Sequence, residues 1–571
     1  MNELSKWKVT AFKSMALAMV AATALAGCSG GNNGGGNSGS AGSNGASPEP
    51  AASTAPSPDA STAPEASGWQ VGSEPLEYSM YGHYDWYTMP KWGGDVSSKW
   101  IMDNMKVNVT AVQSGGNAAQ KLNTMIASGK LPDVIWLDKG ADVEKLREAD
   151  MLVPFDDYID KYPNFKKWVG EKNINMLRSS DGKIYQFPNW YSSQPFGNAG
   201  YLVNKKYYEA LGSPKLETTD DFYNYLKAVK EKFPTVVPFN PDLAVDGQGL
   251  DVIYSAFAED ANLAAIGNRA AITGDKLTSI FQDPVYRESM LFNSRLFREK
   301  LMSPDAMTQK KDQVKEKAFT GKVAVFAGAS PTEYGSAGDA ELKKADPNDG
   351  YFMIWPIRKE GLNKDKIFPG TYTGLGWNVS VITKSAKDPE KIFAFLDWLT
   401  GPEGTRTLMW GPEGMYWEGH DEEGSPLFKD TYLTDVKGRT KVMDATVNLQ
   451  WVGNSAFMDK SKMKFESTLP DDQKTWETRY QSTITWKTQK DATEFINLAP
   501  APNSEEGIIQ TSVEEIWDES RAKALYAKSD EEVLAILDKA DKDAMAIGYQ
   551  QLLDYKTNKW HENRKIIGSN G

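Results

Sequence analysis

Short runs rich in β-branched and aromatic residues alternate with amphipathic helical patterns along this chain, and this alternation constrains its fold more than any other feature. Strands that alternate with helices in sequence pack as α/β layers, with sheets that are largely parallel. The chain has 571 residues, which exceeds what one hydrophobic core usually supports. We therefore predict an α/β fold with more than one lobe. The strand-like runs cover residues 133–138, 201–204, 322–328, 351–357 and 376–382.

Two of the intervening helices have clear boundary signals. A helix over residues 218–233 begins with Thr218 and Asp221, which have the spacing of a capping box. A helix over residues 118–130 ends at Gly129, since glycine readily adopts the left-handed conformation that closes a helix. The last hundred residues show mostly helical periodicity, so we expect a mostly helical C-terminal end.

The first 27 residues have the pattern of a secretory signal, with three lysines ahead of an apolar stretch over residues 14–27. This stretch is too short to span a membrane as a helix. Its end, LAGC, finishes at Cys28 and resembles the bacterial lipobox, in which the cysteine thiol is lipidated and cleavage makes it the new N-terminus. The alternative is an ordinary secretory signal with a chance cysteine. The resemblance implies a lipoprotein signal peptide over residues 1–27 and lipidation, with palmitate, at Cys28.

Residues 28–68 consist almost entirely of Gly, Ser, Asn, Ala and Pro and contain no aromatic residue. Such a segment cannot bury enough apolar surface to offset its ordering entropy, so we predict a disordered Gly/Ser/Pro tether. The folded part would then begin near Trp69 and be held by a lipid anchor at the extracellular face of the cell membrane.

Charge and rare residues exclude several classes of function. The formal net charge is −13, and an acidic protein repels phosphate backbones, so we expect no nucleic-acid partner. Cys28 is the only cysteine, and the three histidines stand far apart in the chain. These counts argue against a metal centre with thiolate or imidazole ligands, and we expect no metal and no cofactor.

Five segments combine strand, turn and helix patterns in a fixed order, at residues 121–160, 181–190, 201–212, 321–328 and 376–404. The first begins KLNTMIASGKLPDVIWLD and passes from helix through a turn to a strand. Together they resemble the extracellular solute-binding proteins of ABC importers, the maltose-binding-like family 1. The closing stretch YQQLLDYKTNKW, residues 549–560, is similar to the end of the long Gram-positive-type lipoprotein branch of that family.

This resemblance implies a two-lobed, periplasmic-binding-protein-like fold of type II, with discontinuous lobes joined by hinge crossover strands. By analogy, the chain would cross between lobes near residues 198–204, near Trp355 and near Trp417. The N-terminal lobe would comprise residues 69–198 and 356–418, and the C-terminal lobe residues 199–355 and 419–571.

The function implied by the resemblance is capture of an oligosaccharide in a cleft between the lobes and delivery to the permease subunits of an ABC importer. Such a protein is not an enzyme, and we expect a monomer. Two alternatives remain open at this point. One is a receptor for a peptide or another non-sugar solute, and the other is a secreted glycoside hydrolase or lyase, which would need two suitably spaced carboxylates.

Some members of the family carry a structural calcium loop, and Asp242, Asp246 and Asp251 surround Gly247 in this chain. Their spacing lacks the alternating register of an oxygen-ligand loop. We therefore favour a hydrogen-bonded turn over a calcium site.

Aromatic residues follow the first predicted strand, where Tyr84 and Trp86 stand among polar and turn residues. Flat rings beside hydrogen-bonding groups suit a sugar, whose CH faces stack on the ring while its hydroxyls pair with polar groups. The alternative is that these rings pack at the edge of the lobe.

The resemblance places further ligand contacts at matching positions. Asp138 follows a strand where the family binds ligand hydroxyls, although the same carboxylate would also suit a helix cap. The Gly-Pro-Trp form of the family's aromatic contact is absent around Tyr334. The predicted ligand-binding residues are Tyr84, Trp86, Asp138, Lys139, Asn189, Trp190, Tyr191, Ser330, Tyr334 and Tyr372.

Overall fold

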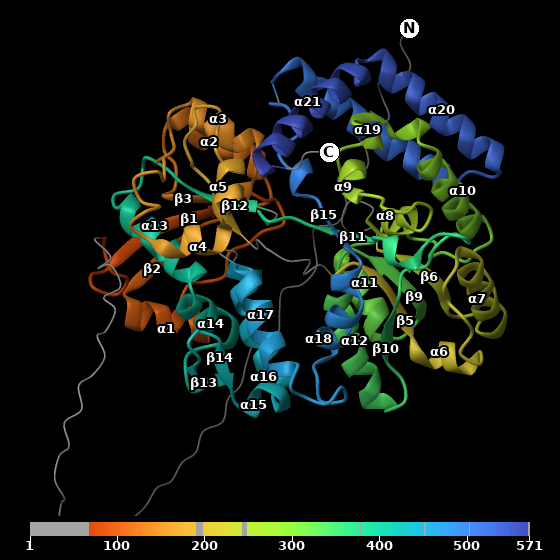
Figure 1. The fold of residues 1–571 in the computed structure, drawn as a ribbon, viewed down its shortest axis with the longest axis horizontal. Coiled ribbons are helices and arrows are strands. Elements are labelled where there is room, and N and C mark those ends of the chain that lie inside the picture. The colour runs from red at the N-terminus through yellow and green to blue at the C-terminus, as the bar shows by residue number, and fades with distance from the viewer. Residues whose placement is uncertain are drawn as a thin grey trace, which may run out of the picture. The chain divides into compact units, whose positions relative to one another are not determined.

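Two separate β-sheets form the framework of the computed structural model, and helices surround both of them (Figure 1). The structure describes residues 68–189, 198–242, 248–376, 378–449, 453–501 and 503–568. The predicted signal peptide, Cys28 and nearly all of the predicted tether lie outside these ranges, as do Trp190 and Tyr191. No helix within the described ranges is long and apolar enough to cross a membrane.

The first sheet has the strand order β2-β1-β3-β12-β4. Strand β1 is parallel to β2 and β3, whereas β12 is antiparallel to β3 and β4. The bounds are β1 (Leu76–Gly82), β2 (Val107–Val112), β3 (Val134–Asp138), β4 (Phe187–Asn189) and β12 (Asn378–Ile382).

The second sheet has the order β10-β5-β9-β6. Strand β5 is antiparallel to both β10 and β9, and β6 is parallel to β9. The bounds are β5 (Gly200–Asn204), β6 (Val237–Pro241), β9 (Val323–Gly328) and β10 (Tyr351–Ile354).

The α/β class is confirmed, but the expectation of largely parallel sheets is wrong, because both sheets are mixed. The strands β5 and β12 explain the difference. The chain reaches each of these strands after leaving the other sheet. Strand β5 then runs antiparallel to β9, and β12 runs antiparallel to β3.

The chain leaves the first sheet after β4 and belongs to the second sheet at β5, so most of the range predicted for the first crossover, residues 198–204, is strand β5 itself. The second was expected near Trp355, but Ile357 is buried in the core beneath the second sheet. The chain returns to the first sheet at β12. Before that, strand β11 (Gly370–Tyr372) pairs in parallel with β15 (Gln489–Asp491). The crossover expected at Trp355 therefore lies further along the chain, between Tyr372 and Asn378.

The third crossover was expected near Trp417, which is instead buried in the core of the first sheet. Tyr432 and Phe457 are buried in the same core, whereas Trp476 packs against the core of the second sheet. The chain therefore returns after Phe457, and the packing around the first sheet extends beyond the predicted lobe boundary at residue 418.

The helices that share the first core come from two parts of the sequence, because the chain leaves this core and returns to it. The hairpin of β13 (Trp417–His420) and β14 (Pro426–Phe428) joins them. The helices are α1 (Val96–Met105), α2 (Ala118–Ser128), α3 (Ala141–Glu148), α4 (Pro163–Val169), α5 (Glu171–Met176), α13 (Pro389–Thr400), α14 (Pro402–Trp410), α15 (Thr431–Thr434), α16 (Val436–Leu449) and α17 (Ser455–Glu466).

The second sheet is covered by helices whose apolar faces form two neighbouring clusters. The predicted capping box is confirmed in α7, where Thr218 and Asp221 bond reciprocally, and the predicted stop at Gly129 is confirmed in α2. The helices are α6 (Lys205–Ala210), α7 (Thr219–Lys232), α8 (Gln248–Ser255), α10 (Pro284–Arg298), α11 (Lys311–Phe319), α12 (Pro331–Ala345) and α18 (Trp476–Thr483).

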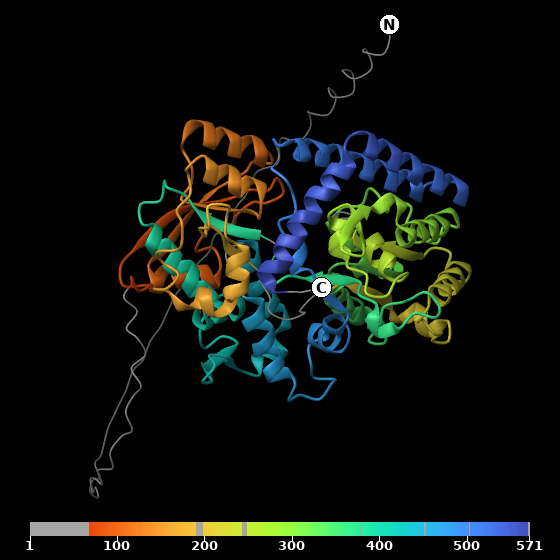
Figure 2. The same cartoon turned by 45° about the horizontal axis from the view of Figure 1, so that its top comes forward.

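A further cluster, which we call the C-terminal helical region, has its own core around Trp517. The blue helices at the end of the chain lie beside the yellow-green ribbon of α10 in both views (Figures 1 and 2). The expectation of a mostly helical end is confirmed. The region comprises α9 (Leu263–Gly267), the hairpin of β7 (Ala270–Thr273) and β8 (Lys276–Ser279), α19 (Glu505–Leu525), α20 (Asp530–Ala546) and α21 (Tyr549–Ile567).

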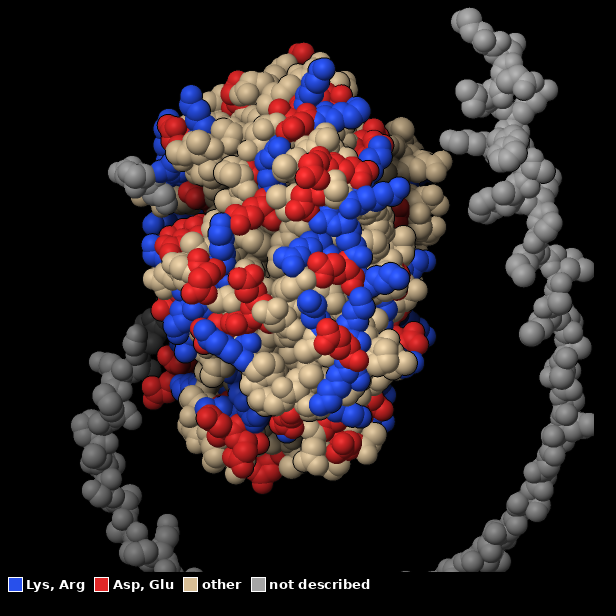
Figure 3. Space-filling view, turned by 90° about the vertical axis from the view of Figure 1, so that its right-hand side faces the viewer, with Lys and Arg blue, Asp and Glu red and all other residues tan. Residues whose placement is uncertain are grey.

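Charged side chains of both signs are interspersed on the face shown in Figure 3. Ion pairs join α10 to α20: Arg287 Nη1 lies 2.7 Å from Asp538 Oδ1, and Arg298 pairs with Asp530. Short 3-10 turns complete the secondary structure of the residues that the structure describes: η1 (Ile280–Gln282), η2 (Lys364–Lys366), η3 (Thr485–Lys487) and η4 (Thr493–Phe495).

Candidate functional site

An aromatic cluster forms where β1 ends beside β3. The ring of Tyr84 lies 4.5 Å from that of Trp136 and 5.3 Å from that of Trp86, measured between centroids. Trp86 and Trp136 are perpendicular, with centroids 6.1 Å apart. The pairing of Gly82 with Trp136 in the sheet, and the hydrogen bond from His83 N to Trp136 O, place these segments side by side.

Exposure divides the cluster into a surface part and a support. Trp86 is 64% exposed, whereas Trp136 is fully buried and Tyr87 nearly so. A Cβ at Gly82 would lie 2.1 Å from a ring carbon of Tyr87, so only glycine leaves room for that ring. Trp136 and Tyr87 therefore support Trp86, which presents its ring to solvent. Trp136 was predicted only as part of a buried strand, so its contact beneath Trp86 was not foreseen.

The exposed carboxylate of Asp138 lies beside the aromatic cluster, in contact with Tyr84. Tyr84 Oη donates a hydrogen bond to Asp138 Oδ1 at 2.7 Å. Burial and the neighbouring Asp138 carboxylate raise the pKa of Tyr84, so its hydroxyl stays protonated at neutral pH. The alternative role of Asp138 as a helix cap is wrong, because α3 begins after Gly140 with no side-chain cap.

Lys139 points toward a crossover segment. Its ammonium donates from Nζ to the carbonyl of Gly376 at 2.6 Å, just before β12. Burial lowers the pKa of Lys139 to about 7, and the carboxylate of Asp138 opposes this shift. The same segment is tied to the C-terminal part of the chain, because Gly374 N donates to Thr493 Oγ1 at 3.0 Å. Lys139 thus links the end of β3 to a connection between the sheets.

Three polar residues lie in one row across the first sheet, because Asn378 of β12 pairs with Asp138 on one side and Asn189 on the other. Asn189 Oδ1 accepts a hydrogen bond from Gly453 N at 2.6 Å. Within the described residues, Asn189 Nδ2 and Asn378 Oδ1 are buried and have no hydrogen-bond partner. Unsatisfied buried amide groups of this kind are costly, so this edge of the sheet is suited to further hydrogen bonds, in which Asn189 Nδ2 donates and Asn378 Oδ1 accepts. Asn378 was not foreseen because only the strand pairing brings it beside Asp138.

The remaining predicted residues lie with the second sheet or on β11. Ser330 precedes α12, and Tyr334 is 5% exposed with its ring 5.4 Å from that of Phe326. A Cβ at Gly328 would lie 2.9 Å from Asp242 Cβ and 3.4 Å from Tyr334 Oη, so Asp242 and Tyr334 flank this glycine. Asp242 was weighed only as a calcium ligand and was not foreseen beside Tyr334.

Tyr372 is half-buried on β11, where it pairs with Asp491 of β15. Burial, together with that carboxylate, raises the pKa of Tyr372. The predicted ligand-binding residues that the structure describes are therefore divided among the first sheet, the second sheet and the β11–β15 pair, and the role of the set as a single ligand site stays a prediction.

A calcium site was weighed for the segment around Gly247, of which residues 243–247 lie outside the described ranges. Among the residues that the structure does describe, no group of three or more His, Cys, Asp or Glu side chains could hold a metal ion. The expectation of no cofactor stays a prediction.

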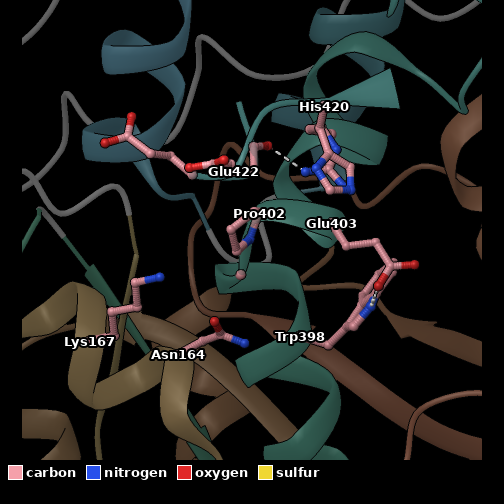
Figure 4. Close-up of a pocket in the computed structure, with 11 residues that line it drawn as sticks. Asn164, Lys167, Trp398, Pro402, Glu403, His420 and Glu422 are labelled. Atoms are coloured by element: carbon pink, nitrogen blue, oxygen red, sulfur yellow. Dashed lines mark hydrogen bonds between the residues drawn. The ribbon is translucent and has the colours of Figure 1, made fainter. Parts of the chain in front are cut away.

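A cavity of about 430 Å³ lies where α4, the turn between α13 and α14 and the β13–β14 hairpin meet (Figure 4). Its walls combine Asn164, Lys167 and His420 with the pair of Trp398 and Glu403, in which Trp398 Nε1 donates to Glu403 Oε2 at 3.1 Å. None of these residues belongs to the aromatic cluster.

A second cavity of about 310 Å³ is lined by residues that include Ser79 and Asp133, near the start of β3. Asp133 Oδ2 accepts hydrogen bonds from the nitrogen and hydroxyl of Ser79 at 2.6 and 2.7 Å. Asp138 stands at the other end of β3, so neither cavity coincides with the predicted ligand residues.

Comparison with known proteins gives the family. The family model described as "Bacterial extracellular solute-binding protein" matches residues 103–406, more than half of the chain. The polygalacturonan/rhamnogalacturonan-binding protein YtcQ of Bacillus subtilis is 23% identical over 377 residues, 64% of this chain and 69% of YtcQ. The lipoprotein LipO of the same organism is 25% identical over 324 residues, 54% of this chain and 61% of LipO.

The fold comparison agrees. The solved structure of the Streptococcus pneumoniae ABC-transporter substrate-binding protein FusA with kestose has a TM-score of 0.61 and 18% identity, and it covers 86% of this chain and all of FusA. The likeness to this two-lobed protein concerns the fold alone. With more than half of its length matched by the family model, the chain belongs to the bacterial extracellular solute-binding proteins, a class that is not enzymatic.

Proposed function

We propose that this solute-binding protein captures an oligosaccharide with the aromatic cluster at the end of β1 and delivers it to the permease subunits of an ABC importer. The observation that carries the proposal is Trp86, a 64%-exposed tryptophan ring beside the Tyr84–Asp138 hydrogen bond. An exposed aromatic ring that adjoins other rings and convergent hydrogen-bonding groups has the composition of a ligand-binding site. The curated relative YtcQ is named for polysaccharide binding, which supports a sugar ligand.

The chemistry of the cluster suits a sugar. The face of Trp86 offers a flat apolar surface for the CH groups of a pyranose or furanose ring. Asp138 keeps acceptor capacity beyond the bond from Tyr84, and a carboxylate accepts sugar hydroxyls in charge-assisted bonds.

Contacts from the other sheet would complete the site. Ser330 and Tyr334 remain the proposed partners on that side. Tyr372 on β11 is a further proposed partner, as are Trp190 and Tyr191 from outside the described ranges. A ligand that touches both sheets stabilises the closed arrangement, and this closure distinguishes the loaded from the empty receptor.

The proposed location follows from the N-terminal sequence and from LipO, which is named a lipoprotein. We place a signal peptide at residues 1–27, lipidation at Cys28 and a tether up to residue 68, so that the protein acts as a monomer on the outer face of the cell membrane. Membership of a non-enzymatic family removes the hydrolase or lyase alternative.

The test is a ligand screen by thermal shift, followed by calorimetry, with oligosaccharides and peptides of similar size. A ligand that binds only the folded state raises the melting temperature by mass action. We expect stabilisation by an oligosaccharide. The increase in melting temperature should be smaller in Trp86→Ala and unchanged in Ile508→Ala, a control whose side chain is 62% exposed on α19. Stabilisation by peptides alone would establish the alternative of a peptide receptor.

A further inference from the structure

Three buried polar side chains on one face of the first sheet carry hydrogen-bonding atoms that have no partner among the residues that the structure describes. Asn378 of β12 pairs with Asn189 of β4, and Ser380 follows Asn378 two residues later, so the three side chains share one face. Each is at most 1% exposed. The unpartnered atoms are both polar atoms of the Asn378 amide, Asn189 Nδ2 and Ser380 Oγ. Such atoms are costly in this conformation of the protein.

Asn378 also lies beside the hydrogen bond that joins Tyr84 to Asp138. It is directly opposite Asp138 in the antiparallel pair of β12 and β3, a position in which Cβ atoms are about 4.5–5.5 Å apart. Burial and the Asp138 carboxylate raise the pKa of the Tyr84 hydroxyl, and the Asn378 amide opposes this increase. The amide therefore lies close to the hydroxyl, although the two groups do not have the geometry of a hydrogen bond.

Rotation of the Tyr84 hydroxyl would use this spare capacity. A tyrosine hydroxyl has one hydrogen, which turns about the C–O bond toward the acceptor that it serves. In the structure the acceptor is Asp138 Oδ1, and a bond to an ionised carboxylate is stronger than a bond to an amide. A sugar hydroxyl that donates to Asp138 supplies an equivalent bond, after which Tyr84 is able to donate to Asn378 Oδ1. The protein then loses no hydrogen bond, and the buried amide gains one.

We infer that Asn378 is a positioning residue for sugar capture, which accepts the Tyr84 hydroxyl when a sugar hydroxyl takes its place on Asp138. The inference rests on the proposed function and adds one residue to the same site. It requires a solute that donates a hydroxyl to Asp138, as an oligosaccharide does. The bond from Tyr84 to Asn378 is present only in the sugar-loaded protein, so it favours the loaded state over the empty one.

The experiment compares Asn378→Leu with the wild type in the full protein. Leucine keeps the branch at Cγ and removes both polar atoms. Calorimetric titration uses a panel of raffinose, stachyose, maltotriose and trigalacturonate, and the sugar that binds wild type most tightly is the probe. We expect its affinity to fall roughly three- to tenfold, the range that the loss of one net hydrogen bond produces. The urea midpoint should stay the same or rise, because an unpartnered buried amide is removed.

The Tyr84→Phe background tests the route through the hydroxyl. Phenylalanine has no hydroxyl to donate, so Asn378→Leu should cause no further loss of affinity in this background. If Asn378→Leu does not fold, which circular dichroism shows, Asn378→Ala removes the amide without adding apolar volume and takes its place in both backgrounds.

The matched control is Asn293 on α10, a helix that packs around the second sheet. Asn293 is fully buried, and neither polar atom of its amide has a partner within the described part of the chain. Asn293→Leu should therefore have the same effect on the urea midpoint as Asn378→Leu. It should leave the affinity for the sugar unchanged, because Asn293 does not adjoin the aromatic cluster.

The outcomes are distinguishable. A loss of affinity in Asn378→Leu that disappears in the Tyr84→Phe background supports the inference. Unchanged affinity in Asn378→Leu, equal losses in both backgrounds, or a urea midpoint well below that of Asn293→Leu overturns it and leaves sugar capture intact. Binding of no sugar of the panel by wild type would instead overturn the proposed function.

Discussion

The aromatic cluster at the end of β1 and the C-terminal helical region contain the same two residue types but differ in the exposure of the tryptophan. Each contains a tryptophan packed on another aromatic ring and a lysine that donates to a backbone carbonyl: Lys139 to Gly376 O and Lys556 to Asn268 O, at 2.6 and 2.9 Å. Trp86, however, is 64% exposed beside an acidic group, whereas Trp517 is fully buried.

The difference lies in what covers the rings. Trp517 stacks on Tyr286 with centroids 5.0 Å apart, and the guanidinium groups of Arg269 and Arg521 lie 5.4 and 5.1 Å from its ring. Trp86 has Tyr84 and Trp136 beneath it and solvent above it. The comparison teaches that aromatic content alone indicates no binding site. A ring whose other face is open, beside free hydrogen-bonding capacity, is a candidate for one.

The largest expected effect tests whether the buried Trp517 serves stability and not ligand binding. Trp517→Ala removes a buried ring from the core of the C-terminal helical region, and we expect it to lower the free energy of unfolding by about 3–5 kcal/mol. Ligand affinity in the folded fraction should stay unchanged. Urea denaturation measures the first quantity and calorimetry the second. A loss of affinity with full stability would assign Trp517 to binding instead.

The second effect concerns the buried lysine of the same region. Burial lowers the pKa of Lys556 from 10.5 to about 8, with Arg269 contributing and Glu514 opposing. Between these two values the folded protein binds fewer protons than the unfolded chain, so the free energy of unfolding rises with pH. We expect this group to add about 2 kcal/mol between pH 8 and pH 10.

Lys556→Met should remove that contribution. The free energy of unfolding is measured at pH 8 and pH 10 for wild type and variant. The change with pH in wild type minus the change in the variant gives the contribution of Lys556, because the titration of all other groups cancels. Parallel pH profiles for the two proteins would show that Lys556 keeps an ordinary pKa.

Trp86→Ala is the matching change in the aromatic cluster. Because the ring is mostly exposed, we expect the free energy of unfolding to change by about 0.5 kcal/mol or less. Oligosaccharide affinity should fall roughly tenfold, equivalent to about 1.4 kcal/mol. Calorimetry with the best ligand of the screen measures this loss. A variant that binds normally would contradict the assignment of Trp86 as the stacking platform.

The smallest effect isolates one hydrogen bond. Tyr84→Phe keeps the ring against Trp136 and removes the hydroxyl that donates to Asp138 Oδ1. We expect affinity to fall by about 1 kcal/mol or less, since Asp138 would be held less firmly and a typical hydrogen bond contributes about that much. The double variant with Asp138→Asn should show non-additive losses, because the two side chains act through one contact. Additive losses would mean that they bind the ligand independently.

Much of the local structure could be predicted from the sequence. The capping box of Thr218 and Asp221 and the helix end at Gly129 depend on neighbouring residues only, and both were identified correctly. The short strand-like runs also became strands at β3, β5, β9, β10 and β12. Tyr84 and Trp86 were predicted to follow one strand and Asp138 to end another, and in the structure these strands, β1 and β3, are parallel neighbours that end side by side.

The remaining features required contacts between distant parts of the chain. A run of β-branched residues reveals that a strand forms, but neither its direction nor its partners, so the antiparallel placement of β12 and the row of Asp138, Asn378 and Asn189 could not be foreseen. For the same reason, the crossovers expected at Trp355 and Trp417 were misplaced.

Local interactions thus determine the helices, the strands and the chemical groups available at the end of β1, because propensity, capping and side-chain chemistry act over a few residues. Only tertiary packing decides which tryptophan is covered by arginines and which faces solvent, and which lysine is turned toward a crossover. These outcomes depend on surfaces that meet across hundreds of residues, and no short stretch of sequence carries that information.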